Sequence, residues 1–162
     1  MAEIMTKFIN DPQHITQELL EGYVLAYPDQ VKLAAENIVV RTHPKSEDKV
    51  AIVTLGGSGH EPALSGFVGE GMLDSSVVGD IFAAPGAQRL FQALQLMKRE
   101  AGILLVVLNH SGDIMSANMA CQLAARVGIK VKQIVTHDDI SAGIGADDKD
   151  RRGLAGCVPL YK

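Results

Sequence analysis

The chain has 162 residues, of which 47% are hydrophobic and 21% are charged. This length fits one domain, and the composition excludes intrinsic disorder, which needs fewer apolar residues and more net charge. The net charge of −4 excludes the basic surface that nucleic acids and acidic membranes require, so we expect a small-molecule or protein partner. Glycine, at 16 residues, is more frequent than usual, which predicts many turns or backbone close to a ligand.

Cysteine usage and terminal sequence indicate the compartment. Cys121 and Cys157 form no CxxC motif and have no histidine at metal-ligand spacing, so we predict buried thiols in a reducing compartment. The first residues contain no apolar run of signal-peptide length, and no stretch approaches the roughly 18 apolar residues of a membrane span. We expect a cytoplasmic protein without a membrane segment.

The first predicted elements are a helix and a strand. Asp11-Pro12 is a helix-start signal, and apolar side chains from Ile15 to Tyr27 recur every three or four residues, which predicts a helix to about residue 26. Pro28 ends it. The β-branched segment 37–42 predicts a strand, followed by a charged turn at residues 45–49.

Strands and helices then alternate. Residues 50–55 form a continuous apolar run that stops at Gly56, which is typical of a strand buried on both faces. Further strands are predicted at residues 76–79, 102–108 and 129–135, with helices at 88–98 and 114–127. The pattern predicts a single α/β domain over residues 1–162: a largely parallel or mixed sheet with helices on both faces, in a three-layer sandwich. Ligands of such sheets bind at the carboxyl ends of the strands.

The stretch Gly56-Gly57-Ser58-Gly59-His60-Glu61-Pro62 follows the buried strand, where the next helix should begin. Glycines let a ligand approach backbone N–H groups, a helix N-terminus favours a polar oxygen or anion, and His60 would lie beside that ligand. The alternative is a tight turn in which the glycines only relieve steric crowding and His60 lies on the surface.

Three common motifs do not fit this stretch. A dinucleotide fingerprint needs a glycine where Pro62 stands, and the Gly-Lys-Ser/Thr of a nucleotide phosphate loop does not occur in the chain. A nucleophile elbow needs glycine in place of His60, which leaves a serine hydrolase built on Ser58 as a weak hypothesis.

A second strand end carries Asn109-His110-Ser111-Gly112-Asp113. Asp113 could cap the following helix, or it could accept a proton or orient His60. Loops from neighbouring parallel strands meet above one edge of the sheet, so His60 and Asp113 are plausible as a facing acid/base pair.

Two further strand ends complete this edge. Residues 79–86 would form a floor or wall of a pocket. Residues 136–140 place Asp138 and Asp139 beside a histidine, which could suggest a divalent metal, but we favour a solvated loop whose carboxylates point apart and predict no metal site. His14 and His43 are interpreted as surface residues.

Together these motifs resemble the dihydroxyacetone (glycerone) kinase family, in its substrate-binding K domain or subunit. The matching stretches run in family order: Phe8-Ile9-Asn10-Asp11-Pro12, Gly56-Gly57-Ser58-Gly59-His60-Glu61-Pro62, Gly69-Glu70-Gly71-Met72-Leu73, Gly79-Asp80-Ile81-Phe82, Ser111-Gly112-Asp113 and Arg151-Arg152-Gly153-Leu154-Ala155-Gly156.

The resemblance implies phosphorylation of dihydroxyacetone or a related short ketose, such as erythrulose, at a terminal hydroxyl. By motif, Gly57, Ser58, Gly59, His60 and Asp113 would bind the substrate, and His60 with Asp113 would be catalytic. The domain itself would bind no cofactor. The phosphoryl donor, ATP or a phosphorelay protein, would come from another domain or subunit, and the resemblance implies a homodimer.

The sequence departs from the family pattern in two ways. Leu108 stands where many members have a lysine, and Ala83, Ala84 and Gly86 stand where hydroxyl residues are common. The family's K unit is also about twice this length, and its second half carries a histidine that binds the ketone carbon as a hemiaminal. We therefore expect the N-terminal part of a K unit, inactive by itself, with a regulatory ketose-binding paralogue as the alternative.

Overall fold

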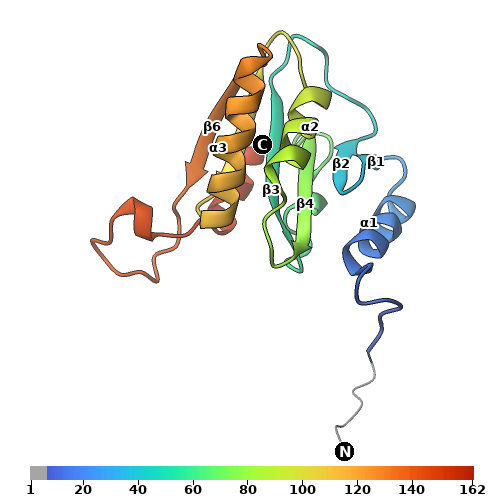
Figure 1. Cartoon of the computed structure of the whole chain (residues 1–162), viewed down its shortest axis with the longest axis horizontal. Helices are drawn as coiled ribbons and strands as arrows, with labels where there is room; N and C mark the ends of the chain where they lie inside the picture. The colour runs from blue at the N-terminus through green and yellow to red at the C-terminus, as the bar shows by residue number, and fades with distance from the viewer. Residues whose placement is uncertain (1–6) are drawn as a thin grey trace, which may run out of the picture.

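The computed structural model describes residues 7–162, which form one six-stranded sheet with helices packed against it (Figure 1). The strands are β1 (Val31–Ala35), β2 (Ile38–Arg41), β3 (Ala51–Ser58), β4 (Ser75–Ile81), β5 (Ile103–Leu108) and β6 (Val131–Thr136). The helices are α1 (Ile15–Ala26), α2 (Ala87–Leu96), α3 (Ser111–Arg126) and the short α4 (Val158–Tyr161). Three 3-10 turns are η1 (Ser65–Phe67), η2 (Asp148–Asp150) and η3 (Ala155–Cys157).

The sheet is mixed and mostly parallel. Its strand order is β1-β2-β4-β3-β5-β6. β3 is parallel to both β4 and β5, and β5 is parallel to β6, whereas β1 and β2 pair in antiparallel fashion at one edge. The carboxyl ends of four strands therefore meet at one edge of the sheet, as the alternation of strands and helices predicted.

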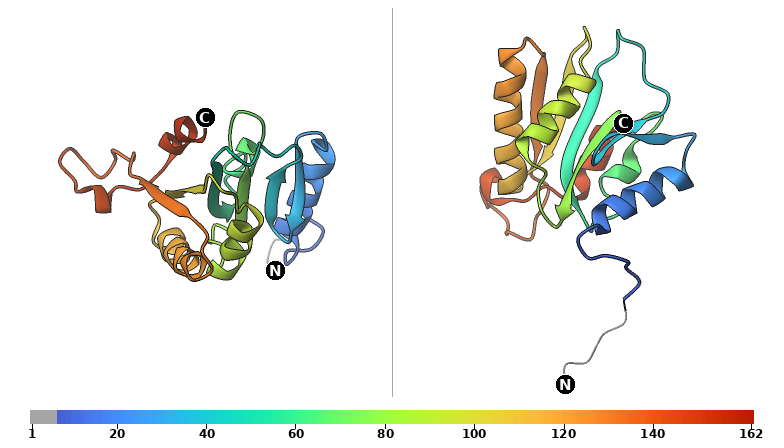
Figure 2. Two further views of the ribbon diagram at one scale, coloured as in Figure 1. Left: turned by 90° about the horizontal axis from the view of Figure 1, so that it is seen from above. Right: turned by 45° about the vertical axis from the view of Figure 1, so that its right-hand side comes forward.

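Two apolar cores, one on each face of the sheet, produce three layers. On one face Leu90 and Leu94 of α2 and Ala117 of α3 pack against Val53 and Leu55 of β3. The other core is built from α1, η1 and the C-terminal segment, and its buried side chains include Leu20, Leu73, Val106 and Tyr161. Figure 2 shows α2 and α3 on one side of the sheet and the C-terminal helix on the other. The predicted three-layer α/β fold is confirmed.

Two predictions that bear on the site are wrong. The glycine-rich stretch is partly strand, because Gly56, Gly57 and Ser58 continue β3 and pair with β4. No α-helix follows it, and only the 3-10 turn η1 occurs before β4. The expected ligand site at a helix N-terminus after His60 is therefore absent.

The strand β1 was not predicted from the sequence either. It has five residues, and along it buried and exposed side chains alternate, starting from buried Val31. A run this short with a lysine and two alanines gives little signal of period two.

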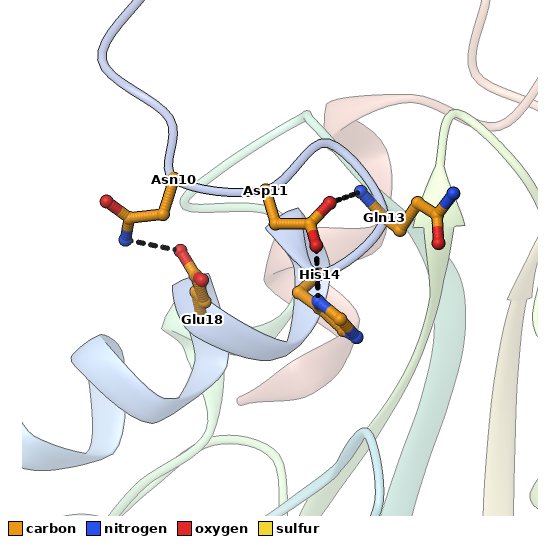
Figure 3. Close-up of polar contacts among 5 residues, drawn as sticks. All are labelled: Asn10, Asp11, Gln13, His14 and Glu18. Carbon is orange, nitrogen blue, oxygen red and sulfur yellow. Dashed lines mark hydrogen bonds and ion pairs between the residues drawn. The ribbon is translucent and has the colours of Figure 1, made fainter.

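The start of α1 also differs from the expectation. The helix begins at Ile15, and His14, an exposed residue, precedes it without a side-chain cap. Asp11 acts one step earlier: its carboxylate accepts the Gln13 N–H at 2.9 Å and contacts His14 Nδ1 at 3.1 Å (Figure 3). The hydrogen bond from Gln13 is the main reason that the pKa of Asp11 is lowered. Asp11 thus forms the turn that leads into the helix.

Two further expectations concern membranes and cysteines. Within residues 7–162 no helix is both long and apolar enough to cross a membrane. Both cysteines are free thiols; Cys157 is buried and Cys121 half-buried.

Candidate active site

A cavity of about 1090 Å³ lies at the carboxyl ends of β3, β4 and β5. Four parts of the chain line it: the end of β3 with the loop to η1, the turn after β4, the junction of β5 with α3, and the segment at residues 149–158, which we call the wall segment. The position agrees with the general rule for open α/β sheets. It brings together the strand ends that the sequence analysis selected.

Glycine at the end of β3 lets the neighbouring turn close over the strand. A Cβ atom on Gly57 would lie 2.7 Å from the backbone nitrogen and 2.8 Å from the carbonyl oxygen of Ala83. Neither backbone atom can move freely, so only glycine fits at this position. Gly57 and Ala83 both line the cavity, and at Gly57 the absence of a side chain leaves the backbone exposed to a ligand.

His60 lines the cavity beside an aromatic ring. Its imidazole meets the edge of Phe82 with ring centroids 4.9 Å apart. Phe82 has a positive φ of 54°, which is unusual for a bulky side chain, and its N–H donates to the Ser58 carbonyl at 2.9 Å. Strain of this kind is found at functional sites, and here it places the aromatic ring against His60.

Two of the predicted substrate-binding residues do not line the cavity. The Ser58 side chain is 1% exposed and its Oγ lies 2.9 Å from Oγ1 of Thr16 in α1, which gives it no contact with a histidine base. Gly59 has a φ of 94°, and its N–H is bonded to the Glu61 carboxylate at 3.0 Å. Both residues shape the turn that carries His60.

Asp113 lies in the first turn of α3 and is one of the residues that line the cavity. It is 7% exposed, and its Oδ1 atom is buried without a hydrogen-bond partner among residues 7–162. Burial raises the pKa of Asp113 to about 6, against an opposing effect of His110. Such a carboxyl group can accept or release a proton near neutral pH. The residue preceding the helix is His110, so Asp113 is not its N-cap.

The structure therefore brings three of the five predicted residues to one cavity: Gly57, His60 and Asp113. As expected, loops from neighbouring parallel strands lie together above one edge of the sheet. His60 comes from the loop after β3, and Asp113 comes from the start of α3.

Sequence reasoning missed the contacts that hold the wall segment. Asn109 Nδ2 donates to the Arg151 carbonyl at 2.6 Å, and His110 Nε2 lies 3.0 Å from the Gly153 carbonyl. The Asp138 carboxylate accepts the N–H groups of Leu154 and Gly156, each at 2.8 Å. The adjacent Asn109 and His110 at a strand end were the available signal, but their partners lie some 40 residues further along the chain.

Tyr161 fixes the far end of this segment. Its side chain is fully buried, and its hydroxyl lies 3.2 Å from Thr54 Oγ1, which in turn donates to the Val106 carbonyl at 2.9 Å. Burial raises the pKa of Tyr161, which therefore stays neutral. The wall segment is thus held at both ends by side chains that reach the central strands.

The two aspartates after β6 have backbone partners instead of a metal-binding arrangement. Asp138 binds the wall segment, and Asp139 accepts the Ser141 N–H at 2.8 Å. The part of the chain that the structure describes contains no group of three or more potential metal-ligating side chains.

Three of the four positions that depart from the family pattern line the cavity. Leu108 lies at the end of β5, and Ala83 and Ala84 lie in the turn after β4, whereas Gly86 is the N-cap of α2 and lies outside. The cavity lining at these three positions is therefore apolar.

Comparison with known proteins identifies the family. The model of the Dak1 domain matches residues 21–162. The chain belongs to the Dak1 domain family. This confirms the resemblance to the K domain or subunit of dihydroxyacetone kinases.

Relatives of the Dak1 chain include both kinase subunits and a regulator. It is 43% identical over 157 residues to the dihydroxyacetone-binding subunit DhaK of a PTS-dependent dihydroxyacetone kinase from Lactococcus lactis, covering 96% of this chain and 47% of that protein. It is 36% identical over 156 residues to the DhaKLM operon coactivator DhaQ of the same organism, again covering 96% and 47%.

A solved structure supports the same fold. The crystal structure of the dihydroxyacetone kinase of C. freundii in its native form superposes with a TM-score of 0.87 and 35% sequence identity, covering 98% of this chain and 29% of that one. The Dak1 chain spans about half the length of the DhaK and DhaQ relatives it matches.

Proposed function

We propose that this chain is the substrate-binding, proton-handling part of a kinase that phosphorylates dihydroxyacetone or a related short ketose at a terminal hydroxyl. The observation that carries the proposal is the shared cavity of His60 and Asp113, in which the Asp113 carboxyl group is buried with one oxygen unpartnered among the described residues. A buried acceptor without a partner is costly, and a ligand hydroxyl would satisfy it.

The chemistry requires one proton acceptor and a fixed substrate. The terminal hydroxyl oxygen of the ketose forms a bond to phosphorus while the bond from phosphorus to the donor's leaving atom breaks. The hydroxyl proton passes to His60 or to Asp113. The pKa of Asp113, about 6, suits a proton acceptor near neutral pH. Backbone groups at Gly57 would hold the small substrate against the cavity floor.

The phosphoryl donor belongs to another domain or subunit in this proposal. The curated DhaK relatives are described as PTS-dependent, which favours a phosphorelay protein over ATP as donor. Because the DhaK relatives are about twice as long as this chain, we propose that these residues supply one side of the active unit and that this chain alone gives little or no turnover when a donor is supplied. We also propose that the unit is a homodimer, as the family resemblance implies.

Binding of dihydroxyacetone to the 162-residue chain tests the proposal. The amide signals of Gly57, His60 and Asp113 should shift in an NMR titration, and His60→Ala should weaken binding at least tenfold. His43→Ala is the matched control, because His43 is exposed and lies outside the cavity. Equal binding by wild type and His60→Ala, or shifts confined to residues outside the cavity, would contradict the proposal.

The second candidate is a ketose-binding regulator without kinase activity. The observation that favours it is apolar Leu108 in the cavity, together with the DhaQ coactivator among the relatives. A mass-spectrometric search for a covalent hemiaminal in the full-length protein separates the two. Retained dihydroxyacetone binding with no adduct would exclude the kinase and leave the regulator.

A further inference from the structure

Phe82, in the turn after β4, has an unfavourable backbone conformation and an exposed side chain. Its φ of 54° lies in the left-handed region, which disfavours bulky residues, and its side chain is 70% exposed. An exposed ring removes little apolar surface from water, so burial does not offset the unfavourable backbone. The stability of the fold therefore does not explain why a phenylalanine occupies this position.

Contacts with the end of β3 determine where the Phe82 ring lies. The Phe82 N–H donates to the Ser58 carbonyl at 2.9 Å. A Cβ atom built on Gly59 would lie 2.9 Å from Cε1 and 3.2 Å from Cζ of Phe82, so the aromatic ring lies directly against the Gly59 backbone. A side chain at position 59 would displace the ring. The glycine after β3 thus leaves room for the aromatic ring from the turn after β4.

The backbone of His60 is held by a hydrogen bond, but its imidazole is not. The His60 carbonyl accepts the Ala63 N–H at 3.1 Å. In the part of the chain that the structure describes, hydrogen bonds hold the imidazoles of His14 and His110, whereas none holds the imidazole of His60. His60 is also an exposed residue. Without another contact its side chain would exchange among three χ1 rotamers.

The Phe82 ring provides that contact. The two ring centroids are 4.9 Å apart and the ring planes are inclined by 61°, which is the edge-to-face arrangement that aromatic rings favour. Both residues line the cavity. The contact therefore favours one orientation of the imidazole at the cavity.

We propose that Phe82 is a positioning residue for His60: the turn after β4 presents an aromatic ring that selects one orientation of the imidazole before a ligand binds. The functional meaning of this role rests on the proposed function, whereas the ring contact itself does not.

Two variants of Phe82 and one control separate the ring from its backbone. Phe82→Asn removes the ring and suits the positive φ, because asparagine tolerates the left-handed region. Phe82→Tyr retains the aromatic ring. Ile140→Asn is the matched control, since Ile140 is an apolar residue that is 83% exposed and does not line the cavity.

The first measurement is NMR of the His60 imidazole in the ligand-free chain, combined with urea unfolding. Wild type and Phe82→Tyr should show nuclear Overhauser effects between the two rings, and His60 ring-proton shifts displaced from those of a free histidine. In Phe82→Asn the shifts should move to free-histidine values, while the unfolding midpoint stays the same or rises. Ile140→Asn should change neither readout.

The second measurement is the affinity for dihydroxyacetone. When the imidazole samples three rotamers in place of one, the binding-competent fraction falls about threefold and Kd rises by the same factor. We expect this loss in Phe82→Asn and wild-type affinity in Phe82→Tyr. In a His60→Ala background Phe82→Asn should have no further effect, because a positioning residue acts only through its partner.

Unchanged His60 ring signals in Phe82→Asn would overturn the inference. A clear loss of stability in that variant would overturn it too, because Phe82 would then serve the fold. Weaker binding caused by Phe82→Asn in the His60→Ala background would do the same, because Phe82 would then contact the ligand directly. The NMR and unfolding readouts need no ketose, so a chain that fails to bind dihydroxyacetone but shows the change at the His60 ring would refute the proposed function and leave this inference standing.

Discussion

Asp74 and Asp113 are carboxyl groups buried at opposite ends of the same sheet, and their surroundings differ. Asp74, 1% exposed at the amino end of β4, lies 2.9 Å from Lys45 Nζ and 3.5 Å from Arg41 Nη1, and accepts the Ile52 N–H at 2.8 Å. In both residues the buried Oδ1 atom accepts no hydrogen bond in the described chain, but Oδ1 of Asp74 lies beside the Arg41 guanidinium, and no such cation contact is made by Asp113 at the carboxyl end of β5.

The difference separates a structural carboxylate from one available to a ligand. Two cations and a backbone donor offset the cost of burying the Asp74 charge and fasten the segment after β2 to the sheet. At Asp113 that cost is largely unmet, which the raised pKa expresses. At the amino end of β4, which we call the closed end, cations and a backbone donor neutralise the buried carboxylate. At the carboxyl end of β5, which we call the open end, a buried carboxyl group is left for a ligand from outside the chain.

The largest expected effect is at the closed end. Asp74→Ala leaves Arg41 and Lys45 without their shared partner, and we expect the free energy of unfolding to fall by about 3–5 kcal/mol. Urea unfolding monitored by circular dichroism measures it. Asp48→Ala, in the exposed loop nearby, should leave the unfolding midpoint unchanged. Equal stability of Asp74→Ala and wild type would remove the contrast between the two ends.

At the open end the opposite sign is expected. The pKa of Asp113 is about 6 in the folded chain and about 3.8 in the unfolded chain, so the folded state binds the extra proton and stability falls as the pH rises through this window. Asp113→Asn removes the buried charge and should raise the free energy of unfolding at pH 8 by about 1–3 kcal/mol. Urea unfolding at a series of pH values should show this gain shrinking towards pH 4. A constant gain, or a loss, would contradict it.

A smaller effect tests the glycine floor of the open end. Gly57→Ala forces a Cβ atom onto the Ala83 backbone, and we expect destabilisation of about 1–3 kcal/mol with weaker dihydroxyacetone binding. Gly86→Ser is the control, because a Cβ there meets nothing within 4 Å. Thermal unfolding with and without ligand measures both. If the two variants behave alike, the close approach of the turn to β3 has no role.

Much of the fold could be predicted because its signals are local. The apolar run of β3 and the helical stripe of α1 lie within single elements, and the order of strands and helices dictates where the parallel ends meet. The position of His60 and Asp113 at one cavity followed from that order. β1 and the strand character of Gly56–Ser58 could not be predicted, since both depend on pairing with a neighbouring strand.

The rest of the site depends on contacts between distant residues. Asn109 and His110 reach residues 151 and 153, and Ser58 turns towards Thr16 of α1, 42 positions away. No pattern within a window of the sequence specifies such partners. The charge environment of Asp113 likewise depends on burial, which only packing determines.

The contacts that hold the wall segment determine what proteolytic cleavage of the loop before it would do to the chain. The loop between β6 and the wall segment projects from the body (Figure 2), and its Ile140 and Ile144 are 83% and 109% exposed. Beyond this loop, the wall segment is held by hydrogen bonds to Asn109, His110 and Asp138, and Tyr161 is buried against the sheet. A protease that severed this loop would therefore leave two pieces that stay together, with the cavity still enclosed by a segment no longer joined to β6 through the backbone.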